Sequence, residues 1–198
     1  MTTQTQPLRG PLRKRESHLW RRDPLDWYVE PEWCSARLFE LEKFEGFIWD
    51  PAAGTGRIIL TARAANYDAG GTDIKSREIS PWHELDFFAA PDLVSSVDNI
   101  VSNPPFGLAE KFAQIALRIT RNKVALLLPA NWVQGDKRSR WLETTPLRRV
   151  LFITPRPSMP PGAIVVSGGA SRNGTTDYAW FIWEHGYAGK PEIGWCRR

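Results

Sequence analysis

Short continuous apolar runs alternate along this chain with stretches in which apolar side chains recur at helical spacing. Continuous apolar character is typical of strands that are buried on both faces of a sheet. One helical stretch places its apolar residues on a single face, and they are Leu108, Phe112, Ile115, Ala116 and Ile119. The runs predict strands at 46–50, 98–102, 123–129, 149–154 and 177–184, and shorter strands that end at Asp73 and just before Asp86. This alternation predicts an α/β fold, in which helices flank a sheet.

The composition of the 198 residues favours one globular domain, with 42% apolar and 24% charged residues. No apolar run approaches the roughly 18 residues that a membrane-spanning helix needs, and the basic N-terminus lacks the apolar core of a secretory signal. Cys34 and Cys196 lie far apart and the three histidines are scattered, so neither a metal site nor a disulfide is expected. These features favour a cytoplasmic protein that has no metal and no membrane partner.

The positive charge is concentrated at the N-terminus. Residues 1–22 hold six Lys and Arg residues against one Glu, a local charge of +5, whereas the whole chain carries +4. We therefore interpret residues 1–22 as a basic arm that is disordered when free, and residues 23–198 as the folded domain. The arm either binds nucleic-acid phosphates or only aids solubility.

Residues 155–176, PRPSMPPGAIVVSGGASRNGTT, interrupt the alternation with a stretch rich in Pro, Gly and Ser. A connection of this length is typical of a functional or mobile loop. We therefore predict a long mobile loop before the last strand.

Three of the ten tryptophans, Trp49, Trp180 and Trp183, fall within predicted strands, so we expect them in the core. Trp132 follows the end of a predicted strand. It either belongs to the core or lines a pocket for the substrate.

A glycine turn, WDPAAGTGR (49–57), follows the first predicted strand and precedes a predicted helix. Gly54 and Gly56 permit a tight turn and allow a ligand to approach the backbone closely. The turn lacks the Gly-Lys-Ser/Thr ending of a phosphate-binding Walker loop. Asp50, Asp73 and Asp86 each follow a successive strand, and the carboxyl edge of such a sheet is where ligands bind. The sequence therefore predicts a nucleotide-type site at this edge.

The stretch SNPPFG (102–107) follows another apolar run, and its two adjacent prolines can continue neither a strand nor a helix interior. A plain connecting loop does not need an amide, two prolines and an aromatic ring together. The combination therefore indicates a functional turn.

Together, DPAAGTG (50–56), GTDI (71–74), LDFF (85–88) and SNPPF resemble the motifs of class I S-adenosylmethionine-dependent methyltransferases. More narrowly, they are similar to those of the adenine-specific DNA methyltransferases, which modify the exocyclic amino group. DWYVEPEW (26–33) resembles the N-terminal cofactor motif of that group, Asp-x-Tyr-x-Thr-Pro, with Glu30 in place of Thr. Its position ahead of the glycine turn is the motif order of the gamma group, and the short chain resembles phage and prophage enzymes. The resemblance covers residues 23–190 and implies a Rossmann-like, mostly parallel seven-stranded sheet with helices on both faces.

The resemblance also implies S-adenosylmethionine as the cofactor and DNA, or RNA, as the partner. In the catalytic turn, Asn103 and the Pro104 carbonyl would accept the two hydrogens of the target amino group, Pro105 would stiffen the turn, and Phe106 would stack on a flipped base. Asp50 and residues 54–56 would hold the methionine end of the cofactor, Asp73 its ribose, Ile74 the face of its adenine and Asp86 the adenine amino group. The cofactor-binding residues implied in this way are Tyr28, Pro31, Asp50, Pro51, Ala52, Gly54, Gly56, Asp73, Ile74, Asp86 and Phe87.

The NPPF signature also serves enzymes that methylate guanine amino groups in RNA or a glutamine amide in release factors. The motif therefore specifies the type of nucleophile better than the substrate. A non-catalytic nucleic-acid-binding module with the same fold is the alternative of a different class. Only about fifteen residues follow the last predicted strand, so no separate target-recognition region is expected, and the oligomeric state stays open, a dimer included.

Overall fold

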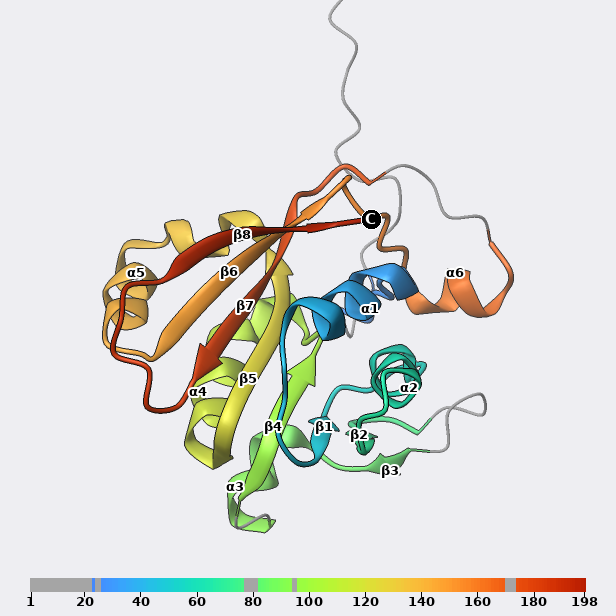
Figure 1. Cartoon of the computed structure of the whole chain (residues 1–198). Helices are drawn as coiled ribbons and strands as arrows, with labels where there is room; N and C mark the ends of the chain where they lie inside the picture. The colour runs from blue at the N-terminus through green and yellow to red at the C-terminus, as the bar shows by residue number, and fades with distance from the viewer. Residues whose placement is uncertain (1–22, 24–25, 77–81, 94–95, 170–173) are drawn as a thin grey trace, which may run out of the picture.

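The computed structural model describes residues 23, 26–76, 82–93, 96–169 and 174–198. The basic arm predicted for residues 1–22 lies outside the described residues. In the described part of the chain, one sheet of eight strands has the order β3-β2-β1-β4-β5-β7-β6-β8 (Figure 1). The α/β class predicted from the alternating pattern is therefore confirmed.

The strands are β1 (Ile48–Asp50), β2 (Ala69–Asp73), β3 (His83–Glu84), β4 (Val97–Ser102), β5 (Thr120–Pro129), β6 (Leu147–Thr154), β7 (Tyr178–Glu184) and β8 (Glu192–Arg197). The α-helices are α1 (Glu32–Leu41), α2 (Arg57–Ala64), α3 (Ala90–Leu93), α4 (Ala109–Ile119), α5 (Asp136–Glu143) and α6 (Gly162–Val166). Three 3₁₀ turns are η1 (Phe87–Ala89), η2 (Phe106–Leu108) and η3 (Ala130–Gln134). Within the described ranges, no helix combines the length and the apolar composition that a bilayer crossing requires.

The sheet is mostly parallel, as predicted, because only β7 runs antiparallel to its neighbours β5 and β6. The prediction of seven strands is wrong, because β8 adds an eighth strand that pairs in parallel with the outer side of β6. In β8 only Cys196 is buried, so the strand lacks the continuous apolar run that marks the central strands. It is held mainly by backbone pairing to β6, which a hydropathy pattern does not reveal.

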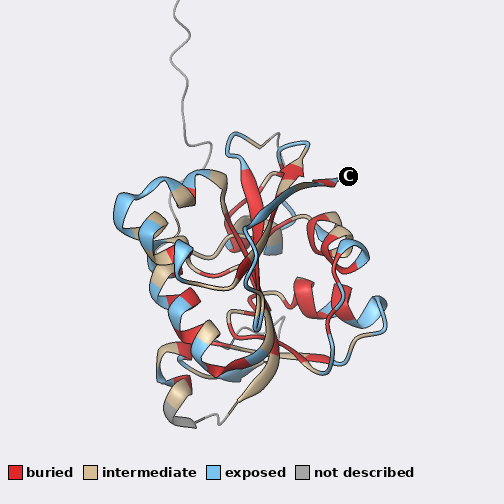
Figure 2. Cartoon of the chain, turned by 60° about the vertical axis from the view of Figure 1, so that its left-hand side comes forward, coloured by how far each residue is buried: buried red, intermediate tan, exposed pale blue. Residues whose placement is uncertain are grey.

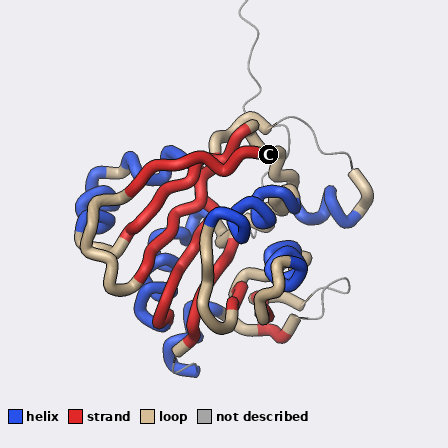
Figure 3. Tube along the Cα trace, in the orientation of Figure 1, coloured by secondary structure: helices blue, strands red, loops and turns tan. Residues whose placement is uncertain are grey.

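The central strands are buried on both faces, and this explains their continuous apolar sequence. Successive residues of β5 alternate between two cores: Val124, Leu126 and Leu128 pack with α4, whereas Ala125 and Leu127 pack with α1 and α2. Figure 2 shows the buried residues along the middle of the sheet and on the inner sides of the helices. Helices therefore cover both faces of the sheet (Figure 3).

The tryptophans expected in the core are buried there, since Trp49 is 6% exposed and Trp180 and Trp183 are fully buried. Trp132 is also buried, and its ring contacts Trp141, Phe181 and Trp183 edge-on. It does not line the cavity described below. Trp132 therefore belongs to the core, which was the first of the two alternatives.

The segment expected to be one long loop is partly helical. Residues Gly162–Val166 form α6, and Pro161 makes an isolated antiparallel bridge with Tyr28. The described part of this segment is therefore anchored to the rest of the molecule, which the Pro- and Gly-rich composition did not predict.

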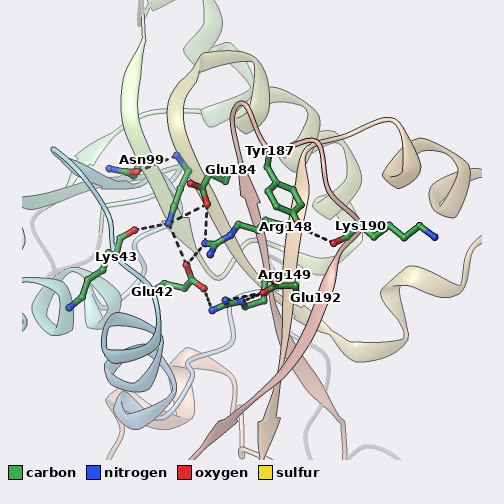
Figure 4. Close-up of polar contacts among 10 residues, drawn as sticks. Glu42, Lys43, Asn99, Arg148, Arg149, Glu184, Tyr187, Lys190 and Glu192 are labelled. Atoms are coloured by element: carbon green, nitrogen blue, oxygen red, sulfur yellow. Dashed lines mark hydrogen bonds and ion pairs between the residues drawn. The ribbon is translucent and has the colours of Figure 1, made fainter.

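An ion cluster lies at the amino ends of β5 and β6 (Figure 4). Asp50 and Asp73 end β1 and β2, so they lie at the opposite edge of the sheet. The Glu42 carboxylate, only 2% exposed, lies 3.4 Å from Lys123, 3.2 Å from Arg148 and 2.5 Å from Arg149. The members of this ion cluster, of which Glu42 is the buried one, are Glu42, Lys123, Arg148, Arg149, Glu184 and Glu192. Three cations face three anions, so the cluster is balanced.

Glu42→Gln should lower the free energy of unfolding by about 3 kcal/mol, because it leaves the three cations without their central buried anion. This value is the low end of the usual cost of removing one partner from a buried ion pair. The low end applies because Lys123, Arg148 and Arg149 keep 13–26% of their side-chain surface exposed. Urea unfolding measures this change. Glu40→Gln, which removes an exposed carboxyl paired with Arg37 on the same helix, is the matched control and should change stability by less than about 0.5 kcal/mol. Equal stabilities of the two variants would contradict the prediction.

Candidate active site

The carboxyl ends of β1, β2 and β4 meet at one edge of the sheet, and a cavity of about 480 Å³ opens there. Because these strands are parallel and adjacent, Asp50, Asp73 and Asn103 reach the same cavity. Of the residues predicted for the site, eleven line it: Tyr28, Asp50, Pro51, Ala52, Gly54, Asp73, Ile74, Asp86, Phe87, Asn103 and Pro105. The four that do not line it are Pro31, Gly56, Pro104 and Phe106.

The glycine turn has the backbone that its sequence predicts. Gly54 and Gly56 have φ angles of +50° and +78°, which favour glycine. A Cβ atom on Gly54 would lie 2.8 Å from the Trp27 indole nitrogen, and one on Gly56 would overlap the Trp82 ring. Gly56 is also the residue that precedes the first turn of α2. Two indole rings therefore pack directly on the turn, and only glycine leaves room for them.

Asp50 is buried at 2% exposure, and both of its hydrogen bonds reach Oδ1. The Ser102 hydroxyl donates at 2.7 Å and the Ala52 backbone N–H at 3.1 Å. The pKa of Asp50 is raised to about 8, mainly by loss of hydration and to a smaller extent by the nearby Glu30 and Asp73, while its two hydrogen bonds lower it. Within the described residues, Oδ2 of Asp50 has no hydrogen-bond partner. A cationic ligand group at Oδ2 would stabilise the ionised carboxylate.

Asp73 and Asp86 serve the local backbone as well as the cavity. Asp73 accepts a hydrogen bond from the Gly54 N–H at 2.8 Å and another from the Lys75 N–H at 3.1 Å, so it ties the end of β2 to the glycine turn. Asp86 is exposed, and it caps η1 by accepting a hydrogen bond from the Phe88 N–H at 2.9 Å. Both carboxylates are thus held in place at the cavity wall.

The Asn103 amide is held by the segment that precedes α1. Its Nδ2 donates to the Tyr28 backbone oxygen at 2.9 Å and to the Glu30 carboxylate at 2.9 Å. In the same turn, the Gly107 N–H donates to Asp26 at 3.0 Å. Oδ1 of Asn103 accepts no hydrogen bond from the described residues. The side chain is therefore oriented so that its oxygen remains an available acceptor.

Three aromatic rings form a cluster beside Asn103. The Phe106 ring is parallel to that of Tyr28, with centroids 6.1 Å apart, and it lies 5.6 Å from Tyr178 at an angle of 40°. Tyr178 begins β7, and burial raises the pKa of its hydroxyl to about 12. Phe106 therefore belongs to an aromatic cluster at the edge of the cavity rather than to its wall.

The segment 26–30 is supported from behind by the Pro- and Gly-rich stretch. The Val29 N–H donates to the Pro160 oxygen at 3.0 Å, and the Gly162 N–H donates to the Trp27 oxygen at 2.9 Å. A Cβ atom on Gly162 would overlap the Trp27 ring. The stretch predicted to be a mobile loop thus packs against the segment that lines the cavity.

Sequence reasoning missed several residues that line the cavity, among them Trp27 and Arg57, and it noted Glu30 only as a departure from the motif. Glu30 is 4% exposed and contacts Asn103, and Arg57 donates to the Glu30 backbone oxygen at 2.7 Å. The departure from Thr was the one signal that pointed to Glu30. In the part of the chain that the structure describes, no three His, Cys, Asp or Glu side chains are grouped as a metal site would need.

Solved methyltransferases have a similar arrangement of strands and helices. The modification subunit of a candidate type I restriction enzyme from Vibrio vulnificus has a TM-score of 0.56 at 14% identity, over 85% of this chain and 46% of that chain. For the M protein of the type I restriction enzyme EcoKI, the TM-score is 0.58 at 12% identity, over 80% of this chain and 44% of that chain. For a candidate RNA methyltransferase from Pyrococcus horikoshii, the TM-score is 0.58 at 17% identity, over 81% of this chain and 87% of that chain.

This chain spans less than half the length of the two restriction-modification subunits. No protein-family model and no curated protein sequence matches it. At identities of 12–17%, the likeness to solved structures concerns the fold. The chain therefore has the Rossmann-like α/β fold of these methyltransferases.

Proposed function

We propose that this chain transfers a methyl group from S-adenosylmethionine to the exocyclic amino group of adenine in DNA. The observation that carries the proposal is the Asn103 amide at the cavity. Its nitrogen is hydrogen-bonded to Tyr28 and Glu30, so its oxygen is left to accept a hydrogen bond from a substrate. An acceptor held in this way suits an amino group, which presents two N–H donors.

The cavity beside Asn103 fits a cofactor that carries positive charge and hydroxyl groups. Burial raises the pKa of Asp50, and a bound cationic group would offset that cost of ionisation. Asp50 would hold the ammonium group of S-adenosylmethionine, and Asp73 would accept from its ribose hydroxyls. Ile74 and Phe87 would contact the adenine ring, with Asp86 near its amino group. When bound, S-adenosylmethionine supplies a methyl group on a positively charged sulfur.

The amino nitrogen of adenine is a poor nucleophile, because its lone pair is delocalised into the ring. Asn103 Oδ1 and the Pro104 carbonyl oxygen would each accept one of its N–H hydrogens, which localises the lone pair and aims it at the methyl carbon. The nitrogen forms the new bond to carbon as the carbon–sulfur bond breaks, and it then releases one proton to water. Pro105 keeps the turn rigid, and Phe106 offers a ring face to the base.

The motif order also supports an enzyme of the gamma group. The segment 26–30 precedes the glycine turn in the chain and contributes Tyr28 and Glu30 to the same cavity. The two restriction-modification subunits with this fold are modification enzymes by their names, which agrees with a DNA substrate. We infer an enzyme of the gamma group that resembles the methyltransferases of phages and prophages.

A second candidate is methylation of a base amino group in RNA. It is favoured by the candidate RNA methyltransferase, of which this chain covers 87%, whereas it covers less than half of the DNA-modifying subunits. The proposed transfer chemistry is the same for adenine in either nucleic acid, and Asn103 keeps its role.

The test is transfer of a radiolabelled methyl group from S-adenosylmethionine to DNA, RNA and protein in parallel. We expect label in DNA, recovered as N6-methyladenine after digestion, and none with Asn103→Ala. Label in RNA alone would establish the second candidate. Cofactor binding without transfer to any substrate would contradict both and leave a non-catalytic binding module.

Asp73→Ala should weaken S-adenosylmethionine binding by about 1.5–3 kcal/mol, the contribution of a hydrogen bond to a charged group. The loss includes a looser glycine turn, because Gly54 also loses its partner. Calorimetric titration measures the dissociation constant. Asp68→Ala, which removes an exposed carboxyl just before the other end of β2, is the matched control and should leave affinity unchanged. Equal affinity of Asp73→Ala and the parent would contradict the assignment.

A further inference from the structure

Glu30 is a buried carboxylate that the proposed chemistry does not yet use. It comes from the segment before α1, is 4% exposed, and accepts a hydrogen bond from Asn103 Nδ2 at 2.9 Å. A buried carboxylate is costly unless it is paired and hydrogen-bonded. Its cation is Arg57, which approaches through a 2.7 Å hydrogen bond to the Glu30 backbone oxygen rather than to the carboxylate. The described side-chain partner of the carboxylate itself is Asn103.

The hydrogen bond has two consequences for the Asn103 amide. First, together with the Tyr28 oxygen, it fixes which side of the amide carries nitrogen, because a carboxylate and a carbonyl can only accept. Second, an N–H that donates to an anion makes the carbonyl of the same amide a stronger acceptor, because linked hydrogen bonds polarise one another. Oδ1 is the oxygen proposed to hold the target amino group.

We propose that Glu30 is a positioning residue for methyl transfer, which holds the Asn103 amide with Oδ1 as acceptor and strengthens that acceptor while Glu30 is ionised. The inference rests on the proposed function, in which Asn103 binds the reacting nitrogen. That nitrogen gains positive charge as the new bond forms. The Glu30 carboxylate is linked to this nitrogen by two hydrogen bonds through the Asn103 amide. It stabilises the positive charge more in the transition state than in the ground state, so it raises kcat.

The groups around Glu30 determine how it titrates. Burial raises the pKa of Glu30, whereas the Asn103 hydrogen bond, a backbone N–H and Arg57 at the start of α2 lower it. Asp50 from β1 and Cys34 from α1 also face it, and the Glu30 charge raises the pKa of both groups. The balance is a carboxyl that takes up a proton at a higher pH than an exposed glutamate. The parent enzyme should therefore lose kcat on the acidic side as Glu30 becomes protonated.

Glu30→Gln tests the proposal, because glutamine keeps the size and an acceptor oxygen but removes the charge. At saturating cofactor and nucleic acid, we expect kcat to fall about 5- to 30-fold, the difference between a charged and a neutral hydrogen bond. The acidic limb of the kcat–pH profile should disappear, while the dissociation constant of the cofactor changes little. Glu32→Gln, the same change at an exposed position two residues away, should behave like the parent.

A spectroscopic measurement tests the contact without any turnover. In ¹H–¹⁵N spectra, the two Asn103 side-chain N–H signals, identified by their loss in Asn103→Ala, should shift with pH as Glu30 titrates. In Glu30→Gln this shift should vanish, and in Glu32→Gln it should persist. Because the parent itself is titrated, the measurement remains decisive if Glu30→Gln does not fold.

The outcomes separate the two proposals. A parent that methylates neither DNA nor RNA contradicts the proposed function, and the Asn103 signals then decide whether Glu30 still orients the amide. A parent that methylates, together with a Glu30→Gln variant of equal kcat and an unchanged acidic limb, overturns the role of Glu30. Asn103 signals that do not respond to pH in the parent overturn it as well.

Discussion

Asn103→Ala is expected to lower kcat by about 10²–10³-fold, while affinity for S-adenosylmethionine changes by less than about two-fold. The magnitude is that of removing one pre-organised polar group that acts on the reacting atoms. Asn103 acts on the target amino group rather than on the cofactor, so its loss removes an interaction that is needed in the transition state. Single-turnover methylation and calorimetric cofactor titration measure the two quantities separately.

The substitution also affects stability, to a smaller extent. Glu30 and the Tyr28 oxygen lose their donor, which should lower the free energy of unfolding by about 1–3 kcal/mol. Asn122→Ala is the matched control. It also removes an amide that donates to a backbone oxygen, but it does so near the amino end of β5, at the edge of the sheet opposite the cavity. Near-parental turnover of Asn103→Ala would contradict the proposed mechanism, and a loss of turnover in Asn122→Ala would show that the assay reports stability instead.

The position of the site could be predicted from the sequence because it depends on strand ends. Asp50, Asp73 and Asn103 each lie at or just after the end of a predicted strand, and parallel strands bring their carboxyl ends to one edge. The structure confirms that these three residues line one cavity. The turn at Gly54 could also be predicted, because only glycine adopts its backbone without strain.

The contacts that orient Asn103 could not be predicted, because each joins two residues that are far apart in the chain, with separations of 75 and 73 positions. No local pattern indicates that the Glu30 side chain is buried. Its segment takes its place by pairing with Pro160 and Gly162, in a stretch whose composition indicates a loop. The eighth strand escaped prediction for a related reason, since β8 is defined by backbone pairing and buries only Cys196. Hydropathy patterns report burial and carry little information about pairing at the edge of a sheet.

Asp50→Asn is expected to stabilise the cofactor-free protein and to weaken cofactor binding. With a pKa of about 8 in the folded chain and near 4 when unfolded, Asp50 takes up a proton on folding between those pH values. The unfolded chain then binds fewer protons, so the free energy of unfolding falls as the pH rises from about 4 to about 8. Asparagine does not titrate. The free energy of unfolding of the variant should therefore exceed that of the parent. The difference grows with pH and reaches a value on the order of 5 kcal/mol near pH 8.

Urea unfolding of the cofactor-free protein at several pH values from 5 to 8 measures this difference. Asp68→Asn, an exposed carboxyl just before β2, is the matched control and should follow the parent at every pH. Parallel profiles for Asp50→Asn and the parent would show that Asp50 ionises normally in the folded state.

The same carboxyl should make cofactor binding release a proton. Below about pH 8 the free protein holds Asp50 protonated, and a bound ammonium group favours the carboxylate, so the proton leaves on binding. Calorimetric titration at pH 7 in two buffers of different ionisation enthalpy should therefore give different apparent binding enthalpies for the parent, equivalent to about one proton released. For Asp50→Asn, the two buffers should agree, and affinity should be weaker by about 1.5–3 kcal/mol because the charged hydrogen bond is lost. If the parent binds with the same enthalpy in both buffers, Asp50 does not meet the cationic end of the cofactor.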